Sequence, residues 1–412
     1  MARNRVVITG LGAVTPVGSR NDNFWNAVME GKSGVDLISR FNTSAFKTRI
    51  GAEVRDFDPK AFGIAPKNAK RMDLFTQYGV AAASLAIEDS GLQLEAYNDR
   101  IGTMIGTGIG GLMTLEQEKK RLIESQNPSR VSPFLIPMMM PNAVNAHVSI
   151  MHKLTGTSPC IANACATGVY TLIYATKDVA LGDFDVIIAG GSEAILTEIA
   201  ASSFANMKAL SRRNDDPKRA CRPFDKDRDG FVIGEGAGVL VIESLDHALA
   251  RNAKIYAEIV GYTTNTDAYH ITAPDPNARM VKKAIRDSLQ MAGLEPKDVD
   301  YINAHGTSTP LNDKAEASAI SEVFGDYKVP LSSTKSMIGH LIGAAGAVEA
   351  VTCALAMEKQ IIPPTINYET PDPEMDVNVI TEPTPAELNI VMNNSFGFGG
   401  HNAVMILKRY QG

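Results

Sequence analysis

The sequence predicts an α/β protein with buried sheets, because short apolar runs alternate along the chain with longer segments of helical periodicity. Many of the apolar runs end in a glycine and a polar turn. The clearest strand-like runs are Val6–Thr9, Ile101–Ile105, Val186–Ala189, Val239–Ile242, Ala257–Val260, Val299–Asn303, Val329–Ser332 and Val404–Leu407. Helical patterns lie between them at Phe75–Asp89, Thr167–Leu181, Ala278–Ala292 and Ala344–Glu358.

The length of the chain indicates more than one core. It has 412 residues, whereas single hydrophobic cores stop growing at about 250–300 residues. Two packed units, or one unusually large domain, are therefore expected. Arg5–Gly12 and Lys254–Tyr262 both look like opening strands. This weak symmetry predicts two similar halves, formed by residues 1–250 and 251–412.

The composition excludes several classes of protein. The chain is 44% hydrophobic and 21% charged, with a formal net charge of -6, which disfavours a nucleic-acid partner. No apolar segment reaches the roughly 18 residues of a membrane-spanning helix, and the N-terminus lacks a secretory signal. The cysteines form no dense disulfide framework and the histidines no metal-binding pattern. We therefore expect a cytoplasmic protein with free thiols, no metal and no membrane contact.

Cys165 stands at the predicted start of the helix Thr167–Leu181, between two alanines. Apolar residues follow it at helical spacing, and Gly182 is a natural helix stop. Unpaired N–H groups at a helix N-terminus favour a thiolate and can bind an oxyanion. The alternative is a buried, inert cysteine, and this segment alone favours that alternative. It is also the interpretation of the other cysteines, which are Cys160, Cys221 and Cys353.

Two histidines follow strand-like runs, which is where α/β folds gather their chemistry. His305 comes just after Val299–Asn303, and His340 follows Val329–Ser332 by way of Lys335. Glu349 lies in an apolar, alanine-rich helical segment, where a carboxylate needs a partner. We expect Lys335 to be that partner.

The segment 393–402, Asn-Asn-Ser-Phe-Gly-Phe-Gly-Gly-His-Asn, predicts a flexible glycine loop with an aromatic tip just before the final strand. Phe396 is the residue that packs such a turn if its role is structural. Phe398 is the residue that gates a pocket if its role is functional, and its N–H is then a candidate oxyanion donor.

Together these segments resemble the condensing enzymes of fatty-acid synthesis, the beta-ketoacyl-acyl carrier protein synthases, and in particular their type II members. The resemblance runs the full length of the chain. It rests on Ala164-Cys-Ala-Thr-Gly168, His305-Gly-Thr-Ser-Thr309, Lys335-Ser-Met-Ile-Gly-His340 and Asn394-Ser-Phe-Gly-Phe-Gly-Gly400, with Arg222-Pro-Phe-Asp-Lys-Asp-Arg-Asp-Gly230 in support. The family implies a thiolase-like fold of two α/β halves in five layers (αβαβα), and a homodimer.

The resemblance also implies roles for individual residues. Cys165 would be the nucleophile, His305 and His340 would stabilise the decarboxylation transition state, and the Phe398 N–H would join that of Cys165 in an oxyanion hole. The remaining positions that match are the supporting residues Lys335, Glu349, Asp313 and Glu316, the pantetheine-binding residues Thr307 and Thr309, and Ile109 of the acyl pocket.

The implied reaction joins malonyl-acyl carrier protein to an acyl chain on Cys165, and it needs no cofactor beyond the phosphopantetheine arm that the acyl carrier protein brings. That partner would dock on basic residues, for which the candidates are Lys67, Lys70, Arg71, Arg130 and Lys208. A cluster of charges is more often only a solvated face, and the resemblance is what favours docking.

The chain departs from the family pattern close to the site. Asn163 and His401 stand where many relatives carry threonine, and Leu311-Asn312 replaces a commoner glycine-containing turn. A thiolase would carry a second catalytic cysteine in the C-terminal glycine motif, where this chain has none. An initiating synthase would use a Cys-His-Asn set, and Lys335 and His340 argue against it. A chain-length factor would lack the nucleophile, whereas Cys165 is present. A polyketide-type ketosynthase shares the Cys-His-His set and stays the main alternative.

Overall fold

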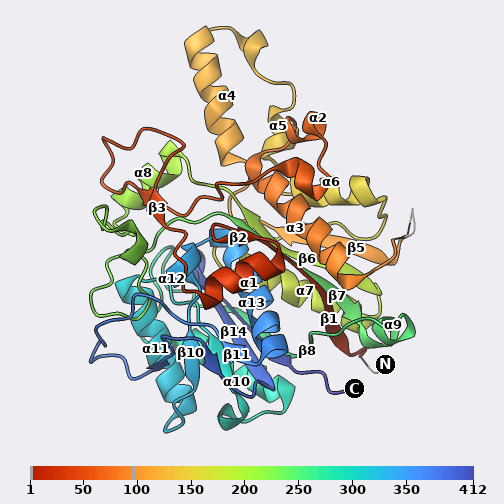
Figure 1. Cartoon of the computed structure of the whole chain (residues 1–412), viewed down its shortest axis with the longest axis vertical. Coiled ribbons are helices and arrows are strands. Elements are labelled where there is room, and N and C mark those ends of the chain that lie inside the picture. The colour runs from red at the N-terminus through yellow and green to blue at the C-terminus, as the bar shows by residue number, and fades with distance from the viewer. Residues whose placement is uncertain (1–2, 95–97) are drawn as a thin grey trace.

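The computed structural model describes residues 3–94 and 98–412, and in this part of the chain an 11-stranded mixed sheet forms the centre of the molecule (Figure 1). Its strands are, across the sheet, β12 (Asn378–Val379), β10 (Pro330–Ser332), β9 (Tyr301–Asn303), β14 (Ile390–Gly397), β15 (His401–Lys408), β8 (Ala257–Thr266), β1 (Val6–Thr15), β7 (Gly236–Ser244), β6 (Val186–Glu193) and β5 (Ile101–Gly106), with β2 (Gly18–Ser19) paired to β1. The predicted α/β class is confirmed.

The strands segregate by sequence, because those before residue 250 lie on one side of the β1–β8 contact and those after it lie on the other. β1 and β8 meet over a short antiparallel register in which Val7 faces Glu258 and Ile8 faces Ala257. That the two groups of strands are repeated halves stays a prediction.

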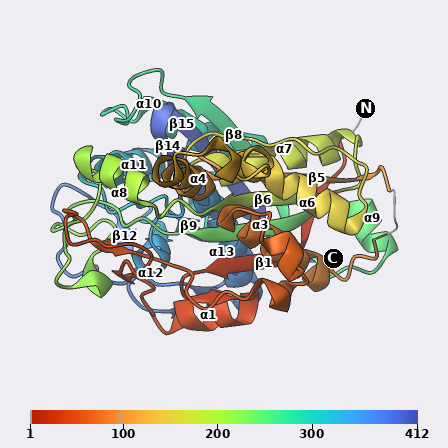
Figure 2. The same ribbon diagram turned by 90° about the horizontal axis from the view of Figure 1, so that it is seen from above.

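Layers of helices and layers of strands alternate through the molecule, five in all. On the first group of strands, α3 (Leu74–Ser90) packs against one face, and α7 (Thr167–Leu181) and α13 (Ala345–Lys359) pack against the other. The same α7 and α13 contact β14, β15 and β8, whose far side is covered by α10 (Arg279–Ala292). Seen from above, α13 lies in the middle of the molecule (Figure 2). The order is thus αβαβα, as expected.

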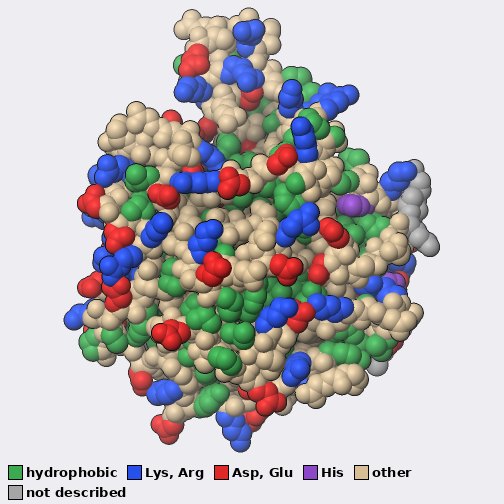
Figure 3. Space-filling view, viewed as in Figure 1, with side chains coloured by type: hydrophobic (Ala, Val, Ile, Leu, Met, Phe, Trp, Pro, Cys, Tyr) green, Lys and Arg blue, Asp and Glu red, His purple; other side chains and the backbone are tan. Residues whose placement is uncertain are grey.

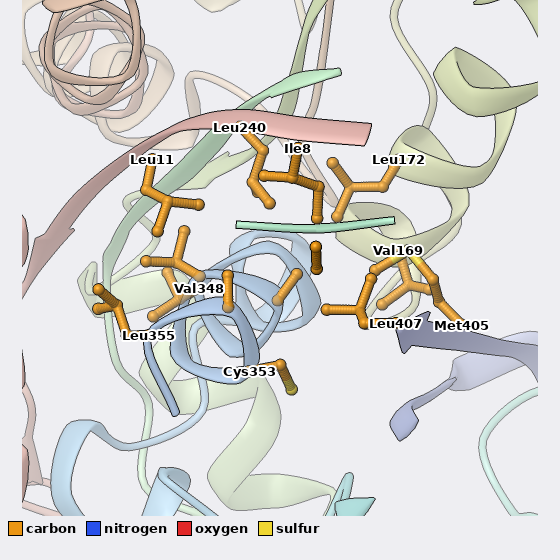
Figure 4. Packing of buried hydrophobic residues seen from close by; sticks show 14 of the residues in the cluster. Ile8, Leu11, Val169, Leu172, Leu240, Val348, Cys353, Leu355, Met405 and Leu407 are labelled. Atoms are coloured by element: carbon orange, nitrogen blue, oxygen red, sulfur yellow. The ribbon is translucent and has the colours of Figure 1, made fainter. Parts of the chain in front are cut away.

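α13 is buried on all sides over residues 345–357, and α7 is buried along most of its length, with Tyr174 and Leu181 exposed. Figure 4 shows Val169 of α7 beside Met405 and Leu407 of β15, and Val348 of α13 on the side of that helix that faces Leu11 of β1. Each large apolar side chain buried in this way contributes about 1.5–3 kcal/mol. A helix that is apolar all round is stable only in such a place, which explains the composition of residues 345–357.

The remaining elements surround this core. They are α1 (Asn21–Met29), β3 (Asp36–Leu37), β4 (Ile50–Gly51), α2 (Pro66–Ala69), α4 (Leu112–Ser125), α5 (Leu135–Met139), α6 (Ala143–His152), α8 (Glu198–Asn206), α9 (Leu245–Ala250), α11 (Pro310–Phe324), α12 (Lys335–Ile338), β11 (Ile361–Ile362) and β13 (Thr384–Pro385). In Figure 1, α4 projects from the top of the body. Of the helices that the described residues form, none has both the length and the apolar character needed to cross a bilayer.

The predicted glycine loop at 393–402 is wrong in its extent. Asn393 to Gly397 belong to β14, which pairs with β15 on one side and β9 on the other, and only Phe398–Gly400 form the turn. Polar residues are tolerated in this central strand because their side-chain amides donate hydrogen bonds. The Asn393 amide reaches the Gly346 carbonyl at 3.0 Å, and the Asn394 amide reaches Glu316 at 3.3 Å.

Candidate active site

Cys165 lies two residues before α7, in a tight turn whose preceding residue, Ala164, has a left-handed backbone (φ +50°). That conformation costs an L-residue roughly 1–2 kcal/mol. Local hydrogen bonds maintain it, since the Ala166 N–H donates to the Asn163 carbonyl at 3.1 Å and the Thr167 hydroxyl donates to the Ala164 carbonyl at 2.7 Å. The turn therefore fixes the cysteine at the head of the helix, as the sequence predicted.

Two backbone N–H groups converge on the sulfur. Those of Phe398 and Cys165 both act to lower the pKa of the Cys165 thiol, and the charge of Lys335 does the same. Gly397 lies so close that a Cβ there would come within 3.1 Å of the Cys165 nitrogen. The turn after β14 thus brings its N–H beside that of the cysteine, which is the geometry of an oxyanion hole.

Burial nevertheless dominates the chemistry of the thiol. It raises the pKa of Cys165 to about 12, against the lowering effects of Lys335 and the two N–H groups. The expectation that the helix N-terminus favours a thiolate stays a prediction, and burial is the effect that opposes it. The N–H groups of Cys165 and Phe398 are placed to stabilise negative charge at this sulfur.

His305 and His340 face the same space from different elements, with ring centroids 5.5 Å apart and planes at 87°. Burial, followed by the charge of Lys335, lowers the pKa of both well below the usual 6.5, so both rings are neutral. The Lys335 ammonium lies 3.4 Å from His305 Nδ1. Because an ammonium only donates, it leaves the ring proton of His305 on Nε2.

His340 is buried, and neither of its ring nitrogens has a hydrogen-bond partner among the described residues. A buried polar atom without a partner is costly unless a ligand satisfies it. Its ring packs edge-on against Phe231, with centroids 5.4 Å apart. The pair of histidines therefore presents neutral N–H donors, free to bind an oxygen of a substrate.

The predicted contact between Lys335 and Glu349 is present. The two form an ion pair in which both side chains are fully buried, and Lys335 also donates to the His305 carbonyl at 2.6 Å. Burial raises the pKa of Glu349, and the lysine charge and hydrogen bond oppose that rise. Lys335 is thus anchored behind His305 and does not line the cavity.

Asp313 and Glu316 of α11 hold the backbone that carries His305. Glu316 accepts the N–H groups of His305 at 2.9 Å and Gly306 at 2.8 Å, and burial raises its pKa to about 7. Asp313 accepts that of Thr307 at 3.0 Å. Their role in this structure is to shape the loop after β9.

A cavity of about 460 Å³ joins these groups, which lies within the usual size of ligand sites. The walls are mainly apolar. The predicted site residues that line it are Cys165, His305, His340, Phe398, Glu316, Thr307, Thr309, Ile109 and Lys208. The hydroxyls of Thr307 and Thr309 lie 2.9 Å apart.

The basic docking candidates Lys67, Lys70, Arg71, Arg130 and Lys208 are all exposed. In the view of Figure 1, the space-filling picture shows Lys and Arg side chains on the upper part of the molecule, over α2 and α4 (Figure 3). The Arg71 guanidinium lies over the ring of Phe134, 4.3 Å from its centroid. Apart from Lys208, these residues lie outside the cavity.

Sequence reasoning missed two features near the cavity. Glu193, at the end of β6, is fully buried and binds the loop that carries Ile109. Asn163 and His401, identified only as separate departures, lie together, with 3.4 Å between the Asn163 amide nitrogen and His401 Nδ1. The Gly-Gly-Ser-Glu run at the end of an apolar strand was the available signal for Glu193.

The chain is similar over its full length to proteins of known family. A family model described as the N-terminal domain of beta-ketoacyl synthases matches residues 3–248, and one for the C-terminal domain matches residues 256–369. A 3-oxoacyl-[acyl-carrier-protein] synthase 2 from Synechocystis is 48% identical, over 100% of this chain and 99% of its own.

Solved structures agree. The ishigamide ketosynthase/chain length factor superposes with a TM-score of 0.93 at 36% identity, covering 100% of both chains. A type II polyketide ketosynthase in complex with its acyl-carrier protein gives 0.91 at 33% identity, covering 99% of this chain and 100% of its own. These matches confirm the expected thiolase-like fold. The chain, with two neutral histidines facing a cysteine in one apolar cavity, belongs to the beta-ketoacyl synthase family.

Proposed function

We propose that this protein is a 3-oxoacyl-[acyl-carrier-protein] synthase, an acyltransferase that elongates fatty acids by decarboxylative condensation. The observation that carries the proposal is the convergence of the Cys165 sulfur, two backbone N–H donors and two neutral histidines on one apolar cavity. The relative at 48% identity bears this enzyme name, whereas the polyketide ketosynthase matches at 33% identity. Fatty-acid synthesis is therefore favoured over polyketide synthesis.

In the first half-reaction the Cys165 sulfur attacks the thioester carbon of an acyl-acyl carrier protein. The oxyanion that forms accepts hydrogen bonds from the N–H groups of Cys165 and Phe398, where loss of one donor costs about 2.7–4 kcal/mol in comparable sites. The carbon–sulfur bond to the carrier then breaks. The thiol proton of Cys165 ends on the released carrier thiol, and the acyl chain stays on Cys165.

In the second half-reaction the malonyl carboxylate leaves as carbon dioxide, and its bonding electrons form an enolate on the thioester. His305 Nε2–H and His340 donate to the enolate oxygen. The enolate carbon attacks the acyl thioester on Cys165, and the sulfur leaves as a thiolate that takes up one proton. The product is a 3-oxoacyl chain two carbons longer, and no metal or redox step is required.

Thr307 and Thr309 line the cavity beside His305 and are proposed to bind the phosphopantetheine arm. Lys208 at the cavity, with Lys67, Lys70, Arg71 and Arg130 on the exposed surface, is proposed to dock an acidic acyl carrier protein. The solved polyketide ketosynthase binds an acyl-carrier protein. Such contacts speed encounter, and we expect the apparent KM for the carrier protein to rise with salt.

We also propose that the protein is a cytoplasmic homodimer. Large apolar side chains are exposed on three helices, of which α4 contacts α5 and α5 contacts α6. They are Ile123 (61% exposed), Ile136 (59%) and Ile150 (75%). Exposed apolar side chains on neighbouring helices support the proposal that a second copy of the chain covers them. Sedimentation should give a dimer that Ile150→Glu weakens, and a monomeric wild type would overturn this part of the proposal.

The function is tested by intact mass spectrometry of wild type and Cys165→Ala after incubation with a medium-chain acyl-acyl carrier protein. We expect an acyl adduct on wild type only, and its discharge into a 3-oxoacyl product by malonyl-acyl carrier protein. An adduct on Cys165→Ala, or one formed only from coenzyme A thioesters, would overturn the proposal.

A further inference from the structure

Glu193 connects two segments of the cavity wall that are far apart in the sequence. Its Oε1 accepts hydrogen bonds from the Thr107 hydroxyl at 2.8 Å and the Ile109 N–H at 3.3 Å. Its Oε2 accepts those of Gly108 at 2.8 Å and Gly343 at 3.0 Å. Each carboxylate oxygen therefore accepts two hydrogen bonds. Together the two oxygens connect the segment after β5 with the turn just after His340.

Both segments face the reacting groups. Gly108, Ile109 and Ile342 line the same cavity as Cys165 and His340. Packing between them is tight, because a Cβ on Gly108 would come within 2.8 Å of Glu193 Oε2 and 3.1 Å of the Ile342 side chain. An acyl chain on Cys165 therefore extends along a wall whose position is set by this carboxylate.

The bonds explain why a buried carboxylate is retained here. Among the described residues Glu193 forms no ion pair, and burial raises its pKa to about 7 against the opposing effect of its hydrogen bonds. Three of its four partners are backbone N–H groups, which only donate, so a carboxylate with two acceptor oxygens matches them. The bond to Ile109 is the longest of the four and is the first to yield when that residue is displaced.

We propose that Glu193 is a positioning residue that fixes Ile109 in the cavity wall and thereby limits the length of acyl chain that Cys165 accepts. This inference rests on the proposed acyl-transfer function. Release of Ile109 would let the wall move outward at little cost, and longer donors would then be accepted at the expense of discrimination.

Glu193→Gln isolates this contact. With the amide nitrogen in the place of Oε1, the Thr107 hydroxyl rotates to accept and only the Ile109 N–H loses its partner, while Gly108 and Gly343 keep theirs. We expect the ratio of kcat/KM for tetradecanoyl to that for hexanoyl donors to rise about fivefold, the effect of losing the long hydrogen bond to the Ile109 N–H. Glu235→Gln is the control for loss of a buried carboxylate, because Glu235 is equally buried but its partners Arg40, Tyr78 and the Val54 N–H do not line the cavity.

A double-mutant cycle with Ile109→Ala separates positioning from general loosening. If Glu193 acts through Ile109, Glu193→Gln adds nothing to the ratio once Ile109 is alanine. An unchanged ratio in an active Glu193→Gln enzyme, the same rise in Glu235→Gln, or additive effects in the double variant would overturn the inference. Failure of wild type to accept an acyl group on Cys165 would instead overturn the proposed function, and the inference with it.

Discussion

Replacing Lys335 with methionine tests the energetic role of the buried ion pair behind His305. Both members of the pair are fully buried, so the substitution leaves the Glu349 carboxylate buried without its cation. Removing one partner of such a pair costs about 3–5 kcal/mol of unfolding free energy, because the remaining charge is buried without compensation. The His305 carbonyl also loses the donor that lies 2.6 Å away.

The loss should depend on pH in a defined direction. Burial already raises the pKa of Glu349 above its ordinary 4.5, and Lys335 is the group that opposes this rise. Without the lysine, the folded variant binds a proton on Glu349 more tightly than the unfolded chain does. The contribution of Glu349 to stability is therefore most favourable below pH 4.5 and falls as pH rises towards the folded-state pKa, by about 1.4 kcal/mol per pH unit.

Urea denaturation of Lys335→Met at about pH 5.5 and about pH 8 measures this dependence, with the slope given by proton linkage. The double variant Lys335→Met, Glu349→Met is the control. Replacing both ions by apolar groups of similar volume is neutral or stabilising, so the double variant should recover most of the loss and be insensitive to this titration. A single variant as stable as the double at the higher pH, or a loss independent of pH, would refute the reasoning.

Three further predictions concern the reacting groups. His340→Ala should lower the rate of malonyl decarboxylation about a hundredfold to a thousandfold while leaving acylation of Cys165 intact. Carbon dioxide release measures the first step and intact mass measures the second, and an equal loss of both would contradict the assigned role. Because burial and the Lys335 charge lower the pKa of both histidines well below 6.5, decarboxylation should stay constant from about pH 7.5 down to about pH 6, and a tenfold fall across that range would show a histidine titrating there. Gly397→Ala should slow acylation and lower the free energy of unfolding by about 1–3 kcal/mol. The new Cβ would lie 3.0 Å from the Ala166 nitrogen and 3.1 Å from the Cys165 nitrogen. Unchanged acylation would show that the turn can move away.

Much of the fold followed from local patterns. The helix Thr167–Leu181 has the predicted bounds because its apolar spacing is regular and Gly182, in a left-handed conformation, ends it. The contact between Lys335 and Glu349 was predictable because an apolar helix offers a carboxylate no other means of compensation.

What the sequence missed depends on distant partners. β14 was not predicted at Asn393 and Asn394, because amides in a buried strand need acceptors that lie 47 and 78 positions away. The donors that bind Glu193 come from positions between 84 and 150 residues away. The high pKa of Cys165 likewise arises from burial by segments that the local helix start does not reveal.

The arrangement of the cavity has a consequence for synthesis of the protein. Cys165 leaves the ribosome long before Phe398, whose N–H lies beside its sulfur, and before β15, which pairs with β8 and with β14. Domains of this size fold as units during translation, N-terminal part first. The N-terminal strands can therefore form early, but the pocket around Cys165 closes only with the final strands, so a chain interrupted before them carries Cys165 without the Phe398 N–H beside its sulfur.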